Sequence, residues 1–289
     1  MNTSYPPPVD KLLTYGDCRK FREWPDYLAL GFTHEHVDDL IRMATSEELN
    51  WGDSDSLAVW APVHAWRVLG QLRAAAAIAP LINFLKYVEP DDQWAPLELP
   101  QILGMIGPAA IPVLAEFLLN PANGLYPRTY AGDSLCEIGK WHPEFREACV
   151  KHLAAAIKQA ENNHPSLNGF ILANLLDLKA VEAAPEIKRA FDAEAIDPSI
   201  AGDWEDVQIE FGLLEARKTR PTYSVFDSIS EDDDWDEDEE MTGGEESQNE
   251  VIAPLFHNNR KKRDAAKAKN KKAMAKKSRR QNRKKKKKK

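Results

Sequence analysis

Residues 65–82 read Ala65-Trp66-Arg67-Val68-Leu69-Gly70-Gln71-Leu72-Arg73-Ala74-Ala75-Ala76-Ala77-Ile78-Ala79-Pro80-Leu81-Ile82, an apolar helix, an alanine turn and a second apolar segment that begins near Pro80. The same order occurs again in three later stretches, 102–114, 134–143 and 175–187. The equivalent positions in the four stretches are Leu72, Ile106, Ile138 and Leu178. They recur with a period of roughly 35 residues, which is typical of arrays of helical hairpins.

Proline stands at or near the start of the second helix in each unit, at Pro80, Pro112, Pro143 and Pro185. It is tolerated there because an N–H in the first turn has no intrahelical partner to lose. We expect glycine and alanine at the turns to let the two helices of one hairpin approach closely. Since neither helix can bury its apolar stripe alone, neighbouring hairpins must stack. We therefore predict an all-α fold, an α-solenoid of stacked helical hairpins.

The two ends of the array differ from its middle. The stretch Leu30-Gly31-Phe32, followed by Thr33 as a helix N-cap, echoes the repeat and predicts a degenerate unit at the N-terminal end. A polar-faced helix from about Asp203 to Ala216 is expected to close the other end. No stretch shows sustained alternation of apolar and polar residues, so we predict almost no strand. Residues 1–220 form one predicted domain.

A resemblance to a known family is carried by Leu69-Gly70-Gln71-Leu72 with Ala77-Ile78-Ala79-Pro80-Leu81, and by Leu103-Gly104-Met105-Ile106-Gly107 with Ala110-Ile111-Pro112. These units resemble HEAT repeats of the shorter type named after the phycobilisome lyases of cyanobacteria. Residues 60–67 with their flanks also resemble uncharacterised bacterial HEAT-like proteins, which often end in a cysteine-rich zinc module, the SEC-C motif. No cysteine follows Cys149, so that module is not expected here.

The resemblance covers about residues 20–215 and implies the stacked-hairpin fold. It also implies an alternative function, a phycobilin lyase-like or chaperone-like factor that acts on a bilin-carrying protein.

Charge divides the chain into three parts. The whole chain has a formal net charge of −8, yet residues 1–226 and 227–250 each have a net charge of −13, and residues 260–289 have +18. The acidic stretch contains few apolar residues and cannot sustain a core. We therefore predict an acidic disordered linker at 221–259 and a polybasic tail at 260–289.

The tail is the strongest functional signal in the sequence. Its density of cations is typical of a segment that binds the phosphate backbone of RNA, DNA or a ribosome with release of counterions. The tail has no aromatic residue to stack on bases, so we expect poor sequence selectivity. The residues predicted to bind nucleic acid are Arg260, Lys261, Lys262, Arg263, Lys276, Lys277, Arg279, Arg280, Arg283, Lys284, Lys285 and Lys286.

Other interpretations of the tail stay open. It could be a solubilising segment without a fixed partner or, in a nucleated cell, a nuclear localisation signal. A membrane surface is not predicted as its partner, because no apolar face or lipidation motif accompanies the charge. The acidic tract 231–240 could fold back on the tail and compete with nucleic acid. The apolar run 251–256 between them could dock on the array or on a partner, or be a spacer.

Aromatic residues crowd the front of the array. Trp51, Trp60 and Trp66 lie close together in the sequence, and Arg67 follows directly. Tryptophan and arginine are frequent anchors of protein interfaces, so we predict that these four residues bind a protein partner. The alternative is that Trp60 and Trp66 pack in the core. Since Trp66 and Arg67 are adjacent, we expect at most one of them to point into the hairpin core.

No catalytic or cofactor pattern is found. His34-Glu35-His36 does not place two imidazoles on one side of a helix, and the acids at 53–55 and 91–92 fall in predicted loops. We predict no enzyme, no metal site and no cofactor. Three cysteines without a CxxC pair favour a reduced compartment. No signal-peptide pattern or long apolar run is seen, so we expect a cytoplasmic, non-enzymatic scaffold.

Overall fold

The computed structural model describes residues 4–21, 23–53, 55–88, 92, 94–221 and 223. Helices hold 72% of these residues, and the described part of the chain contains no strand. The prediction of an all-α fold is thereby confirmed. The predicted linker, apart from Pro221 and Tyr223, and the whole polybasic tail lie outside the described residues.

Each of the four predicted helix pairs is present. The pairs are α3 (Ala61–Gln71) with α4 (Ile78–Phe84), α5 (Ala95–Ile106) with α6 (Ile111–Leu119), α7 (Leu125–Trp141) with α8 (Arg146–Ile157), and α9 (Pro165–Asp177) with α10 (Ala184–Asp192). The flanking helices are α1 (Val37–Ala44) and α2 (Glu47–Asn50) before them, and α11 (Pro198–Ala201) and α12 (Trp204–Glu210) after them.

Short 3-10 turns connect these helices. In the N-terminal part they are η1 (Val9–Thr14), η2 (Cys18–Lys20), η3 (Leu28–Leu30), η4 (His34–His36) and η5 (Leu57–Trp60). Those that precede a second helix are η6 (Ala75–Ala77), η8 (Pro108–Ala110), η10 (Pro143–Phe145) and η12 (Val181–Ala183). Those that follow a second helix are η7 (Leu85–Tyr87), η9 (Pro121–Asn123) and η11 (Ala160–Asn162).

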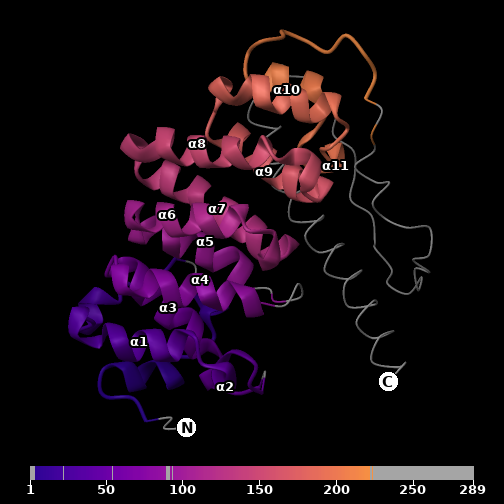
Figure 1. Ribbon diagram of the computed structural model, residues 1–289. Coiled ribbons are helices and arrows are strands. Elements are labelled where there is room, and N and C mark those ends of the chain that lie inside the picture. Colours follow the sequence, from indigo (N-terminus) through magenta and orange to yellow (C-terminus); the bar gives the residue numbers. More distant parts are fainter. Residues whose placement is uncertain are drawn as a thin grey trace, which may run out of the picture.

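The helices form two layers, stacked from the N-terminal end to α10 and α11 (Figure 1). In the first layer each helix packs on the next, in the order α1, α3, α5, α7, α9 and α11. Of the second helices, α6 packs on α7 and α8, and α8 packs on α7, α9 and α10. Helices of successive units therefore pack on one another in chain order.

Two glycines inside helices allow close contact between neighbouring hairpins. A Cβ atom on Gly104 of α5 would lie 2.8 Å from the Cβ of Glu137 and 3.1 Å from Cδ1 of Trp141, both on α7. A Cβ on Gly139 of α7 would lie 2.9 Å from the side chain of Leu178 in the next unit. These two glycines lie inside α5 and α7 rather than at the turns, and the helices that cross there are successive members of the first layer.

The two ends of the array match the sequence in part. Thr33 is an N-cap as predicted: its backbone N–H donates to Nδ1 of His36, 3.0 Å away, at the start of the turn that leads into α1. The last helix is shorter than predicted, since α12 ends at Glu210 rather than near Ala216. It ends there because Gly212 adopts a left-handed conformation with φ of 71°.

No single helix in the described ranges is long and apolar enough to cross a bilayer. The bent pair 95–106 and 108–119 has the required length and apolar composition only when its two segments are taken together.

Candidate protein-interaction surface

One stripe of α3 and the turn before it carries four large or polar side chains. Trp60, His64, Arg67 and Gln71 recur at helical spacing, so they line one side of the helix. The N-terminal segment 15–27 lies along this stripe, because its residues contact each of the four side chains. The stripe therefore joins the N-terminal segment to the array.

His64 is held by two hydrogen bonds. Its Nε2 lies 2.8 Å from the carbonyl oxygen of Gly16, and its Nδ1 lies 2.6 Å from the hydroxyl of Tyr27. A carbonyl oxygen only accepts, so Nε2 must carry the proton, and the Tyr27 hydroxyl then donates to Nδ1. Burial lowers the pKa of His64, and this also favours the neutral ring.

Arg67 joins two hairpins through a buried ion pair. Its Nη2 and Nε donate to the two carboxylate oxygens of Glu98 on α5, at 2.6 and 3.0 Å. The Trp24 ring covers the guanidinium, with 4.8 Å between Cζ and the ring centroid. Gln71, one turn further along, accepts the backbone N–H of Tyr27 and donates to the carbonyl of Pro25.

Trp66 is a core residue. Its side chain is 1% exposed, and its Nε1–H donates to the carbonyl of Ala44, the last residue of α1, at 2.9 Å. Arg67 is 4% exposed, so the expectation that at most one of the two points into the core is wrong. The reason is that α3 is covered on several sides, by α1, by α5 and by the N-terminal segment. In this structure neither side chain offers a surface to a partner.

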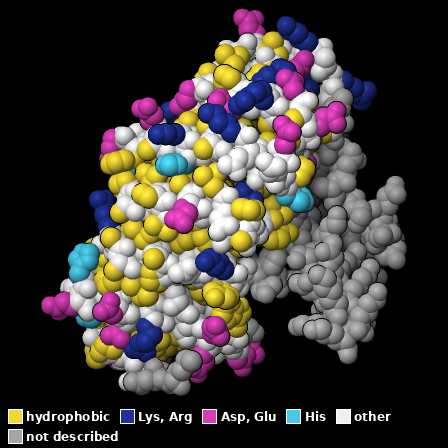
Figure 2. Space-filling model, in the orientation of Figure 1, with side chains coloured by type: hydrophobic (Ala, Val, Ile, Leu, Met, Phe, Trp, Pro, Cys, Tyr) yellow, Lys and Arg dark blue, Asp and Glu magenta, His cyan; other side chains and the backbone are white. Residues whose placement is uncertain are grey.

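Exposed hydrophobic side chains are distributed over the array. On the face that Figure 2 shows, hydrophobic side chains gather over the middle of the array, while charged side chains are more frequent towards its two ends. Among the described residues, the large hydrophobic side chains that remain exposed are Leu28, Leu30, Trp51, Leu57, Tyr87, Leu97, Val113, Trp141, Phe145, Val181 and Leu213.

Four residues form what we call the aromatic patch: Arg19, Trp60, Trp94 and Leu97. The rings of Trp60 and Trp94 meet edge to face, with 5.1 Å between centroids, and both are half-buried. The guanidinium of Arg19 lies 4.8 Å from the Trp60 ring centroid, and its side chain is 64% exposed. Leu97 follows Trp94 by one turn at the start of α5 and is 61% exposed. The patch thus combines aromatic and aliphatic groups with a guanidinium that is paired with the Asp17 carboxylate at 2.6 Å.

The sequence analysis singled out only Trp60 among these four residues. The sequence separation between Trp60 and Trp94 equals the separation between the equivalent repeat positions Leu72 and Ile106. The repeat period could therefore have identified Trp94 as the equivalent of Trp60 in the next unit. Trp51 lies elsewhere: it is 45% exposed and packs on Phe84 at 5.9 Å between ring centroids.

The comparisons with known proteins add no family to this description. No protein-family model, curated protein or solved structure matches this chain.

The described residues contain no group of three His, Cys, Asp or Glu side chains that could hold a metal ion. Cys18, Cys136 and Cys149 are buried cysteines that form no disulfide with one another. Burial raises the pKa of both Cys18 and Cys149 to about 11, so neither is a thiolate near neutral pH. The predicted nucleic-acid-binding residues, Arg260 to Lys286, lie outside the described residues.

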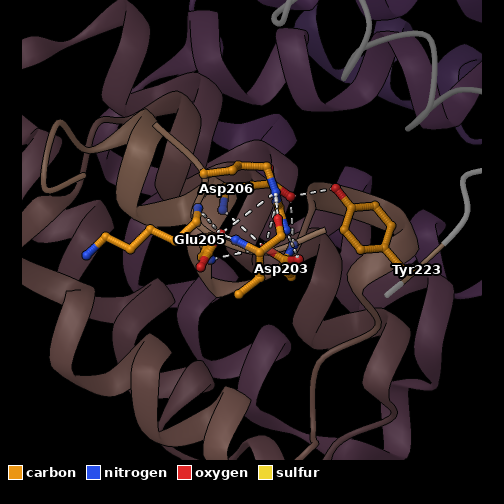
Figure 3. Close-up of polar contacts among 7 residues, drawn as sticks. Asp203, Glu205, Asp206 and Tyr223 are labelled. Atoms are coloured by element: carbon orange, nitrogen blue, oxygen red, sulfur yellow. Dashed lines mark hydrogen bonds and ion pairs between the residues drawn. The ribbon is translucent and has the colours of Figure 1, made fainter. Parts of the chain in front are cut away.

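A second cluster of polar groups holds the chain at the end of the array (Figure 3). Arg217 forms ion pairs with Asp203 at 2.6 Å and with Asp206 at 2.5 Å, and the hydroxyl of Tyr223 donates to Asp206 at 2.5 Å. The Glu205 carboxylate accepts the backbone N–H groups of residues 218 and 219. We call these contacts the C-terminal clamp. They hold Arg217, Lys218, Thr219 and Tyr223 on α12, at the start of the predicted acidic linker.

Two carboxylates of the clamp, Asp203 and Glu205, are stabilised in their charged form. Burial alone would raise the pKa of Asp203, but its hydrogen bonds to Arg217 and to backbone N–H groups lower it below the ordinary value. Backbone hydrogen bonds from Thr219 and Lys218 lower the pKa of Glu205. The clamp is therefore intact at neutral pH, and its chemistry is that of a structural contact.

Proposed function

We propose that this chain is a non-enzymatic interaction protein. Its helical array, a HEAT-like α-solenoid, binds a protein partner through the aromatic patch, and its polybasic tail binds nucleic acid or a ribosome without sequence selectivity. The observation that carries the proposal is the patch itself, an edge-to-face tryptophan pair flanked by an exposed arginine and an exposed leucine. Aromatic and arginine side chains are enriched among the residues that contribute most binding energy at protein interfaces.

The repeated packing supports the solenoid part of the proposal. The first helices pack in chain order, and glycines at equivalent positions lie where successive first helices cross. Such an array has contacts mainly between neighbouring units and presents a long surface to a partner.

The charge of the tail supports the second part of the proposal. A net charge of +18 over positions 260–289 binds a phosphate backbone chiefly by releasing its counterions. If about 8 phosphates are contacted on a duplex, the logarithm of the binding constant falls with the logarithm of salt concentration with a slope of about −7. Binding should therefore be lost in high salt.

The test is a pull-down with the full chain and three variants, with captured proteins and nucleic acids identified separately. Leu97→Glu introduces a charge on the aromatic patch and should remove the protein partner but not the nucleic acid. Val113→Glu is the matched control, because Val113 is 39% exposed and lies on α6. Neutralising Arg283 to Lys286 as glutamines should weaken nucleic-acid capture and leave the protein partner bound.

Two results would overturn the proposal. If the Leu97→Glu variant still captures the protein partner, the aromatic patch is not the binding surface. If neither the glutamine variant nor added salt changes nucleic-acid capture, the tail does not bind nucleic acid by electrostatic attraction. Circular dichroism of each variant checks that the helix content is retained.

A further inference from the structure

The aromatic patch has the composition of a surface that receives an apolar peptide. The edge-to-face pair of Trp60 and Trp94 presents ring faces and edges, with Leu97 one turn away and the Arg19 guanidinium over the Trp60 ring. Surfaces lined by aromatic rings bind short apolar segments, and they favour segments that contain proline because its backbone is already restricted.

One segment of the chain outside the described residues matches this surface. Val251-Ile252-Ala253-Pro254-Leu255-Phe256 is the longest uninterrupted apolar run between residues 224 and 289. It carries four large hydrophobic side chains around one proline, and it stands between the acidic stretch and the basic tail. Burial of these apolar side chains away from water is favourable, whereas the polar residues on either side gain little free energy from burial.

The chain is long enough for this segment to reach the patch. Tyr223 is held on α12 by its bond to Asp206, and residues 224–250 connect it to Val251. For a segment of this length the random-coil relation gives a root-mean-square end-to-end distance of about 30 Å. From α11 to α5 the first layer has three helix-to-helix steps of about 8–10 Å each, a span of about 24–30 Å, to which the distance from Tyr223 on α12 to α11 is added. When the end-to-end distance of a linker matches the distance between the two sites that it joins, the tethered segment has a high effective concentration at its binding site.

We propose that residues 251–256 of the same chain dock on the aromatic patch. The inference rests on the patch being the binding surface proposed above and assigns its regulation: the segment occupies the surface that a protein partner needs, so the partner must displace it. Docking also holds Arg260, which follows closely after Phe256, beside the array. A partner that takes the patch therefore releases the basic tail.

The experiment is fluorine NMR of the full chain with 5-fluorotryptophan at every tryptophan. Trp60→Phe and Trp94→Phe assign the two patch resonances, and Trp66, which is 1% exposed, gives an internal reference from the core. The test variant is Ile252→Ser/Leu255→Ser/Phe256→Ser. The matched control is Val225→Ser/Phe226→Ser, which removes two apolar side chains from the same part of the chain.

We expect the Trp60 and Trp94 resonances to shift in the test variant and to stay in place in the control, with the Trp66 resonance unchanged in both. Unchanged Trp60 and Trp94 resonances in the test variant, or an equal shift in the control, overturn the inference. So does a shift that depends on protein concentration, since it would assign the patch to a second copy of the chain.

This measurement needs no partner, so it separates the inference from the proposed function. If the resonances do not respond but Leu97→Glu still abolishes partner capture, the inference fails and the proposed function stands. If both hold, the test variant should bind the captured partner severalfold more tightly than the unaltered chain.

Discussion

The guanidinium of Arg67 and the carboxylate of Glu98 form a buried ion pair that joins α3 to α5 through two hydrogen bonds. The side chains are 5% and 10% exposed, so both charges are largely removed from water. A buried pair of this kind depends on both members, because either charge alone is left without compensation.

Glu98→Ala should lower the free energy of unfolding by about 3–5 kcal/mol, since it leaves the Arg67 cation buried and unpaired. The double variant Arg67→Met/Glu98→Leu should recover most of this loss, because it replaces the pair with apolar groups of similar length. Urea denaturation followed by circular dichroism measures both. A Glu98→Ala loss below about 1 kcal/mol would mean that water reaches the pair.

His64 predicts a pH dependence of stability. Its pKa in the folded protein is below the ordinary 6.5, because burial disfavours the charged ring. The unfolded chain therefore binds more protons below about pH 6.5, and stability that is present above this pH is lost as the pH falls towards the folded pKa. We expect the melting temperature to drop between pH 7 and pH 5. His64→Gln, which can still donate and accept, should flatten that drop; an identical slope in the variant would contradict the assignment.

Gly104 and Gly70 should respond differently to alanine. A Cβ at Gly104 meets the Cβ of Glu137 at 2.8 Å and must displace α7, so we expect a loss of about 1–3 kcal/mol. At Gly70 the nearest atoms are the side-chain ends of Ile102 and Met105, at 3.1 and 3.3 Å, which can move. There the higher helix propensity of alanine, about 1 kcal/mol, should offset the crowding. Thermal denaturation of the two single variants gives the comparison, and equal losses would contradict the proposed crossing point.

Arg217→Ala should loosen the C-terminal clamp without unfolding the array. Its partners are partly exposed, so we expect a change in global stability of about 1 kcal/mol or less. Amide hydrogen exchange should become faster across residues 203–221, while α7 stays protected. Arg220→Ala, which removes a nearby exposed cation, is the control. Exchange that is faster throughout the array would show that the clamp supports more than its own segment.

Acid should open the same clamp. The pKa values of Asp203 and Glu205 are below their ordinary values, so the clamp is fully stabilising above an ordinary carboxyl pKa of about 4. Its contribution is lost as the pH falls through the lower folded values. Hydrogen exchange of residues 203–221, compared between pH 6 and pH 3 after correction for the intrinsic rate, should show the opening; protection that persists at pH 3 would contradict it.

The repeat period predicted most of the helices and their order. Units that bury apolar faces against one another must have apolar residues and turns at corresponding positions, so the same pattern recurs along the chain. Pro112 and Pro185 stand in the first turn of α6 and α10, as expected. The same period places Trp94 one unit after Trp60. The interface prediction instead included Trp66 and Arg67, because it relied on how close the tryptophans are in the sequence. Whether an aromatic residue is core or surface depends on what covers its helix, and α3 is covered by a segment that lies far before it in the chain.

The sequence alone determined the all-α class, the four helix pairs and the separation of charge along the chain, since these follow from local periodicity, turn residues and composition. Only the tertiary structure decided that the glycines serve contacts between hairpins, that α12 ends at Glu210, that Arg67 is paired with Glu98, and that Trp60 meets Trp94 beneath Arg19. Each of these contacts joins residues far apart in the chain or depends on one backbone conformation. Their energies arise from packing and burial, which no short window of sequence contains.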